Sequence, residues 1–210
     1  MARRSGRRPG ASGTREAIRE AAARLFAERG YDRTSMRAIA AEAGVDLKLV
    51  AYFFGSKQQL FVEVFTPPFD PAVAIPEVFA GDRAEIGERV ARFLLGVLEN
   101  PEGRRRMIGL IRAAASEPEA ARMVRDLISR EVLARIVDAL DVEDADIRAS
   151  LLGSQVVGLA MARYIVCVEP LASMSAEAVV AAIAPNLQRY LVEPLPAPAK
   201  SRARRPARGT

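Results

Sequence analysis

Residues 40–57 read "AAEAGVDLKLVAYFFGSK", a stretch in which one helical pattern stops at Gly44 and a second begins almost at once. Gly44 suits the left-handed conformation of such a corner, where a residue with a Cβ is disfavoured by about 1–2 kcal/mol. Asp46 is a suitable N-cap for the second helix, expected over residues 47–53. The spacing predicts a helix-turn-helix, with Val45 filling the corner. The apolar face of the first helix comprises Met36, Ile39, Ala40 and Ala43.

Further helices flank this motif. The helix before it presents an apolar face with a 3.6-residue period and is expected to end near Gly30. Thr34 is the expected N-cap of the helix that leads into the corner. After the motif, Ser56 and Gln59 have the spacing of a capping box, which predicts a fourth helix. The four helices are predicted to form a compact N-terminal unit over residues 14–65.

The segment "TPPFDPAVAIP" (66–76) contains four prolines, and we expect it to hold no regular helix and to separate two domains. Longer helices are predicted behind it. The first has an apolar face over residues 86–97, the next begins at Asn100 and Pro101, and the last covers 176–191, where Pro185 should kink it. The predicted fold class is all-α. An N-terminal helix-turn-helix three-helix unit is joined by the fourth helix to a C-terminal helical bundle over 77–192, with about nine helices in total.

The composition limits the chemistry that the chain can perform. The 210 residues include no histidine and one cysteine, Cys167. The commonest metal ligand and general base are therefore missing, and an enzyme would have to use carboxylates, Lys, Tyr or Ser. We expect no catalytic residue, no metal and no cofactor, and we expect Cys167 to be a small buried hydrophobic residue. The start lacks the apolar stretch of a secretion signal, which together with the single cysteine predicts a cytoplasmic protein.

Charge is distributed unevenly along the chain. The net charge is +5, but residues 1–13 carry four arginines and residues 194–210 carry five basic side chains. Both ends are poor in large apolar residues and are expected to be a disordered basic arm and a disordered basic tail. The body between the N-terminal unit and the tail is acidic. A basic N-terminal region joined to an acidic body indicates a polyanion as partner of the former.

Two stretches, "LFAERGYDRTSMRAIAAEAGV" (25–45) and "FGSKQQLF" (54–61), resemble the TetR/AcrR family of bacterial transcriptional regulators. The resemblance implies that the start of the second helix, the face of the third and the lysine that opens the fourth contact double-stranded DNA. This chain has Ala51 where the family usually has tyrosine, with Tyr52 beside it. The DNA-binding residues implied are Thr34, Ser35, Arg37, Asp46, Leu47, Lys48, Leu49, Ala51, Tyr52 and Lys57.

The run "ASLLGSQVVGLAMARYIVCV" (149–168) is nearly long enough to span a membrane, but Gln155 and Arg163 would lie within the span at considerable cost. We predict no membrane association and instead a buried helix whose small residues allow close packing. With the last helix it can build a four-helix bundle across a two-fold axis, and the resemblance implies the same homodimer. The predicted dimer interface comprises Gly153, Val157, Gly158, Met161, Val180, Ile183, Leu187 and Leu191.

The resemblance also implies a pocket for an unidentified small-molecule effector in the C-terminal bundle. Methionines among aliphatic side chains suit an adaptable apolar pocket, although each residue could equally belong to plain core. The candidate ligand-binding residues are Phe93, Met107, Leu110, Ile111, Met123, Leu127, Met161 and Tyr164.

These observations predict a ligand-responsive DNA-binding regulator, a repressor, that binds a palindromic operator as a homodimer. The alternative is a helical protein-interaction module without DNA function, which Ala51 and Phe53 would favour. The lack of histidine, of a glycine-rich phosphate loop and of paired carboxylates argues against an enzyme.

Overall fold

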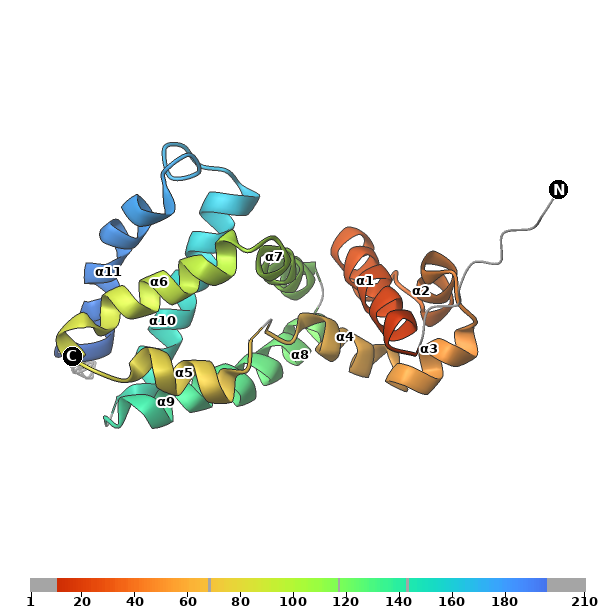
Figure 1. Cartoon of the computed structure of the whole chain (residues 1–210), viewed down its shortest axis with the longest axis horizontal. Coiled ribbons are helices and arrows are strands. Elements are labelled where there is room, and N and C mark those ends of the chain that lie inside the picture. The colour runs from red at the N-terminus through yellow and green to blue at the C-terminus, as the bar shows by residue number, and fades with distance from the viewer. Residues whose placement is uncertain (1–10, 68, 117, 143, 196–210) are drawn as a thin grey trace, which may run out of the picture.

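The computed structural model describes residues 11–67, 69–116, 118–142 and 144–195, and every regular element within these ranges is helical. The prediction of an all-α fold is therefore confirmed. Most of the two basic ends lie outside the described residues. The N-terminal unit contains α1 (Ala11–Arg29), α2 (Met36–Ala43), α3 (Leu47–Phe54) and α4 (Lys57–Phe65). Figure 1 shows α1, α2 and α3 at one end of the molecule, with α4 leading toward the larger body.

The larger body begins with α5 (Pro71–Phe79) and a 3-10 turn (Arg83–Glu85), followed by α6 (Ile86–Glu99) and α7 (Pro101–Ser116). A long helical path then runs through α8 (Pro118–Ile128), a π-helical segment (Ser129–Leu133) and α9 (Ala134–Leu140). The last elements are α10 (Ala145–Ala160), its π-helical continuation (Met161–Ile165) and α11 (Ala176–Val192). Helices α6 and α11 pack side by side along much of their length (Figure 1).

Helix α5 contradicts the prediction that 66–76 holds no regular helix. Asp70 caps the helix by accepting a hydrogen bond from the Ala72 N–H at 2.9 Å, and Pro71 occupies the first turn, where no N–H is needed. Pro76 has no N–H to donate to the Ala72 carbonyl, so one hydrogen bond of the helix is missing. Both residues are exposed, and water can therefore bind that carbonyl. Ile75 then anchors α5 in the core of the body. Burial of one apolar face thus outweighs the effect of the prolines.

Two hydrophobic clusters hold the molecule together, and they do not divide at the Pro-rich segment. The first cluster combines α1 to α4 with Leu110 of α7 and Met123 of α8. Its aromatic centre is Phe26, Phe61 and Phe65, with the rings of Phe61 and Phe65 4.7 Å apart. The second cluster is built from α5, α6, α9, α10 and α11, with Ile111 of α7. Helices α7 and α8 therefore complete the core of the N-terminal unit while belonging to the body.

The structure corrects the expectation for Cys167. The helical path that begins at α10 ends at Ile165, and Cys167 follows with a left-handed backbone, φ 56°, and an exposed side chain. It is not a buried hydrophobic residue, because the chain leaves the bundle two residues earlier. Pro185 lies inside α11 as predicted, and α11 extends one residue beyond the predicted end.

Candidate nucleic-acid interface and effector cavity

The corner between α2 and α3 has the predicted geometry. Gly44 adopts φ 66° and ψ 32°, the left-handed region. Its N–H and that of Val45 donate to the Ala41 and Ala40 carbonyls at 3.2 and 2.9 Å, which satisfies the end of α2. Asp46 then caps α3 by accepting from the Lys48 N–H at 2.7 Å. Local hydrogen bonds therefore fix the angle at which α3 leaves the scaffold.

Helix α3 has one buried and one exposed side. Val50 and Phe54, one turn apart, are buried in the first cluster and anchor the helix. The opposite side projects outward with large apolar groups, because Leu49 is 40% and Tyr52 81% exposed. The predicted residues on this outer face are Asp46, Leu47, Lys48, Leu49, Ala51 and Tyr52, and all six are exposed. On such a face the leucines can contact thymine methyl groups, and Lys48 can donate hydrogen bonds to acceptor atoms on the base edges.

At the start of α2 the structure corrects one predicted contact. Thr34 is buried, and its hydroxyl donates to the Gly30 carbonyl at 2.8 Å and lies 3.1 Å from the Leu25 carbonyl. Thr34 therefore fastens the end of α1 to the loop before α2, and its side chain does not face the surface. The N-cap is Ser35, whose hydroxyl accepts from the Ala38 N–H at 3.1 Å. Ser35 and Arg37 are exposed beside α3.

Lys57 occupies the first position of α4, behind a complete capping box made by Ser56 and Gln59. Its Nζ donates to the Tyr31 carbonyl at 3.0 Å and lies 3.9 Å from the centre of the Tyr31 ring. An ammonium group has three N–H donors, so this anchorage orients Lys57 without using all of its capacity. The sequence did not predict a role for Tyr31. Its position in the loop between α1 and α2 could have suggested a contact with α4.

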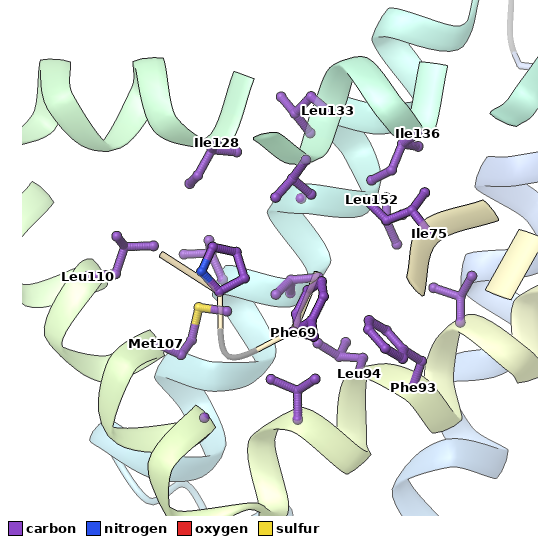
Figure 2. Close-up of a pocket in the computed structure, with 18 of the residues that line it drawn as sticks. Phe69, Ile75, Phe93, Leu94, Met107, Leu110, Ile128, Leu133, Ile136 and Leu152 are labelled. Atoms are coloured by element: carbon purple, nitrogen blue, oxygen red, sulfur yellow. The ribbon is translucent and has the colours of Figure 1, made fainter. Parts of the chain in front are cut away.

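The body contains a partly open cavity of about 190 Å³ between α5, α6, α7, the α8–α9 path and α10. Figure 2 shows Phe69 near its centre, with Met107 and Leu110 toward one side and Ile75 and Leu152 toward the other. The ring centres of Phe69 and Phe93 are 4.9 Å apart in an edge-to-face pair. Of the predicted ligand-binding residues, those in the wall are Phe93, Met107, Leu110 and Leu127.

The other four predicted ligand-binding residues lie elsewhere. Met123 belongs to the first cluster and Ile111 to the second, while Met161 and Tyr164 pack against the second cluster away from the cavity. Sequence reasoning missed the contribution of the 67–79 stretch, because its prolines argued against an ordered wall. From this stretch the cavity receives Pro67, Phe69, Ile75, Val78 and Phe79.

Of the predicted dimer residues, some are buried in the core of the single chain and others are exposed or half-buried. Val180, Leu187 and Leu191 are buried inside the single chain, so α11 directs them into its own core and not toward a partner. Val157 is 41% exposed, and a Cβ added to Gly158 would have no atom within 4 Å. Gly153, Met161 and Ile183 are half-buried. Val157 and Gly158 therefore leave an exposed patch near the end of α10.

Within the ranges that the structure covers, no group of three or more Cys, Asp or Glu side chains could hold a metal ion. Among the same residues, no helix is both long and apolar enough to cross a membrane.

Comparison with known proteins gives two matches to family descriptions and a set of similar folds. Residues 18–64 match the tetR family of bacterial regulatory proteins, and residues 84–191 match the Tetracyclin repressor-like C-terminal domain. A TetR-family regulator from Streptomyces coelicolor is 36% identical, with a TM-score of 0.61 over 89% of this chain and 99% of that chain. No curated protein matches the chain in sequence.

A second solved structure shares the fold at lower identity. NalD, the secondary repressor of the MexAB-OprM multidrug efflux pump in Pseudomonas aeruginosa, is 21% identical, with a TM-score of 0.61 over 82% of this chain and 94% of that chain.

Proposed function

The chain belongs to the TetR family of bacterial regulatory proteins, DNA-binding regulators of transcription, and from this premise we propose that it is a ligand-responsive repressor that binds a palindromic operator as a homodimer. We assign DNA binding to residues 14–65, and ligand binding and dimerisation to 77–192 extended by α5. The observation that carries the proposal is the outer face of α3, which a left-handed glycine and a capped first turn hold clear of the core.

The residues of this face support reading of the DNA major groove. A groove about 12 Å wide accepts a helix, and the N-terminal residues of α3 would meet base edges there. Lys48 provides the hydrogen-bond donors, while Leu47 and Leu49 provide apolar contacts. Ser35 and Arg37 at the start of α2, together with Lys57, would hold the phosphates on either side.

The exposed side of α10 supports a homodimer. Val157 and Gly158 would lie in a patch that packs against the same patch of a second copy, as a two-fold interface requires. Two copies of α3 would then face one side of the DNA, and each would read a half-site, with the half-sites about 34–36 Å apart. Gly153 and Val157 also line the cavity, so the proposed interface and the ligand site share a wall.

The path from the cavity to the DNA face supports ligand response. Phe65, the last residue of α4, contacts the cavity and also the aromatic centre of the first cluster. Pro67 and Phe69, two and four residues further along the chain, line the cavity as well. A ligand that fits better in one position of this segment would shift the population of α4 positions, and with it the spacing of the two α3 helices.

The test is selection of duplexes from a random pool by the full-length protein, followed by titration with the selected duplex. A two-fold symmetric sequence bound by a dimer, at least about 1,000-fold more tightly than random duplex at physiological salt, is the expected result. Binding of both duplexes with equal affinity would contradict an operator-specific repressor. The absence of any salt-dependent binding would favour a protein-interaction module instead.

A further inference from the structure

The walls of the cavity offer a ligand almost no polar partner. The lining residues carry only hydrocarbon, aromatic and thioether side chains, with the exception of Arg106. The Arg106 guanidinium donates to the Thr66 carbonyl at 3.1 Å and forms an ion pair with Glu102. Arg106 is therefore already engaged by these two partners, and no polar atom of the wall faces the interior.

The apolar wall strongly disfavours binding of a charged ligand group. A carboxylate or ammonium group placed here would lose its hydration without gaining a partner, which is among the largest penalties in protein interiors. A neutral hydroxyl would suffer a smaller loss of the same kind. Apolar surface would gain from leaving water in proportion to its area. The cavity therefore favours uncharged molecules with few or no hydrogen-bonding groups.

The size and shape of the cavity limit the ligand further. A dry cavity of about 150 Å³ lined by Leu, Ile and Phe holds benzene. The present cavity, at about 190 Å³, is somewhat larger. Phe69 and Phe93 present an edge-to-face ring pair at 4.9 Å, and Met107 lies on the side of Phe69 away from Phe93 (Figure 2). Ring faces and a thioether suit a flat or compact cyclic ligand.

We propose that the effector of this protein is a small, neutral, cyclic hydrocarbon-like molecule, aromatic or alicyclic, with on the order of ten non-hydrogen atoms. This inference rests on the proposed ligand response, but it concerns which chemistry enters the cavity and is separable from the effect on DNA. The same wall disfavours any charged group that would have to lie inside the cavity.

Three probes of one ring size test the proposal: naphthalene, 2-naphthol and 2-naphthoate, titrated into the full-length protein by calorimetry at pH 7. We expect naphthalene to bind with a micromolar Kd, 2-naphthol about tenfold more weakly and 2-naphthoate at least about 100-fold more weakly. Binding of 2-naphthoate as tight as that of naphthalene would overturn the proposal, and so would the absence of binding by naphthalene at its solubility limit.

A matched pair of variants on α5 locates the bound probe. Val78 lines the cavity, whereas Val73 on the same helix is 54% exposed and does not. Val78→Phe should fill the space and weaken naphthalene binding at least about 30-fold, whereas Val73→Phe should leave it unchanged. Equal binding to both variants, with the thermal melt of Val78→Phe still cooperative, would place the probe elsewhere and overturn the assignment of the cavity.

Release of the selected operator duplex by the three probes separates this proposal from the proposed function. If naphthalene binds as expected but does not change operator affinity, the ligand class stands and the ligand response is wrong. If only 2-naphthoate binds and releases the duplex, the ligand response stands and the neutral ligand class is wrong.

Discussion

The α2–α3 corner and the cavity of the body are built by different kinds of interaction. At the corner, contacts within about five residues set the geometry: Gly44 turns the chain and Asp46 caps α3. The cavity instead depends on helical segments and a linker spread from Phe65 to Val157. A surface for a constant partner such as DNA can be specified locally, whereas an interior space exists only where distant side chains fail to fill the volume between helices.

The largest expected effect concerns α10, which would join two copies of the locally specified corner. Gly158→Arg would place a bulky cation on the proposed two-fold interface opposite its own copy. We expect a monomer by analytical ultracentrifugation and an operator affinity at least about 100-fold lower, since the two half-sites no longer cooperate. Gly96→Arg is the control, because Gly96 on α6 is also exposed with open space around it. A dimeric Gly158→Arg protein would show that the interface lies elsewhere.

The second prediction isolates the local backbone requirement of the corner. A Cβ on Gly44 meets no atom within 4 Å, so Gly44→Ala introduces strain from φ 66° alone. Urea unfolding should show a loss of about 1–2 kcal/mol. Gly96→Ala, in an α-helix with the same open surroundings, should instead gain up to about 1 kcal/mol. If both substitutions shifted stability in the same direction, the corner would not depend on the left-handed conformation.

The third prediction compares two lysines of the DNA face. Lys57→Ala should weaken binding to operator and random duplex alike, by about tenfold, and reduce the slope of log affinity against log salt by about one. Lys48→Ala should reduce operator affinity more than affinity for random DNA, because a base contact is lost. Filter binding across a range of salt concentrations measures both. A change of base preference in Lys57→Ala with an unchanged salt slope would contradict its phosphate role.

The fourth prediction tests the connection between the two regions. Phe69→Ala removes a ring from the cavity without touching the first cluster. We expect unchanged operator affinity in the absence of ligand and a roughly three- to tenfold higher naphthalene concentration for half-release. Fluorescence anisotropy of labelled operator gives both numbers. A variant with altered affinity before any ligand is added would mean that Phe69 sets the resting position of α4.

The smallest expected effect is a pH dependence within the body. Burial opposes ionisation of Glu99, but hydrogen bonds from Tyr164 Oη at 2.8 Å and Arg163 at 3.0 Å outweigh it and lower the pKa of Glu99. Because the pKa of Glu99 is lower in the folded state, its ionised form stabilises the fold at pH values above the unfolded-state pKa. This contribution is lost as the pH falls through the folded-state pKa.

Glu99→Gln should therefore reduce stability at pH 7, and the difference from the parent protein should shrink below about pH 4. Because the Glu99 side chain is 39% exposed, the difference should stay below about 1 kcal/mol. Urea titrations at pH 7 and pH 3 measure it. A difference that does not depend on pH would show that the carboxyl group acts through shape and not through charge.

Sequence reasoning located the features that short-range physics controls. The corner at Gly44, the caps at Asp46 and Ser56, the start of α7 and the extent of α11 all follow from side chains near the backbone groups that they satisfy. It misplaced the N-cap of α2 by one residue, since Thr34 and Ser35 can both cap a helix and only packing against α1 buries the first of them.

Long-range packing decided the rest. A helical pattern shows which residues are apolar, but it does not show whether an apolar side chain faces its own core, a cavity or another copy. Leu187 and Leu191 proved to be core, four of eight pocket candidates lie outside the cavity, and the proline-containing α5 became one of its walls. By itself the sequence determined the all-α class and the α2–α3 corner, because capping and backbone strain act over a few residues. Only the tertiary structure decided where the cavity lies and what faces it, because that depends on how distant helices meet.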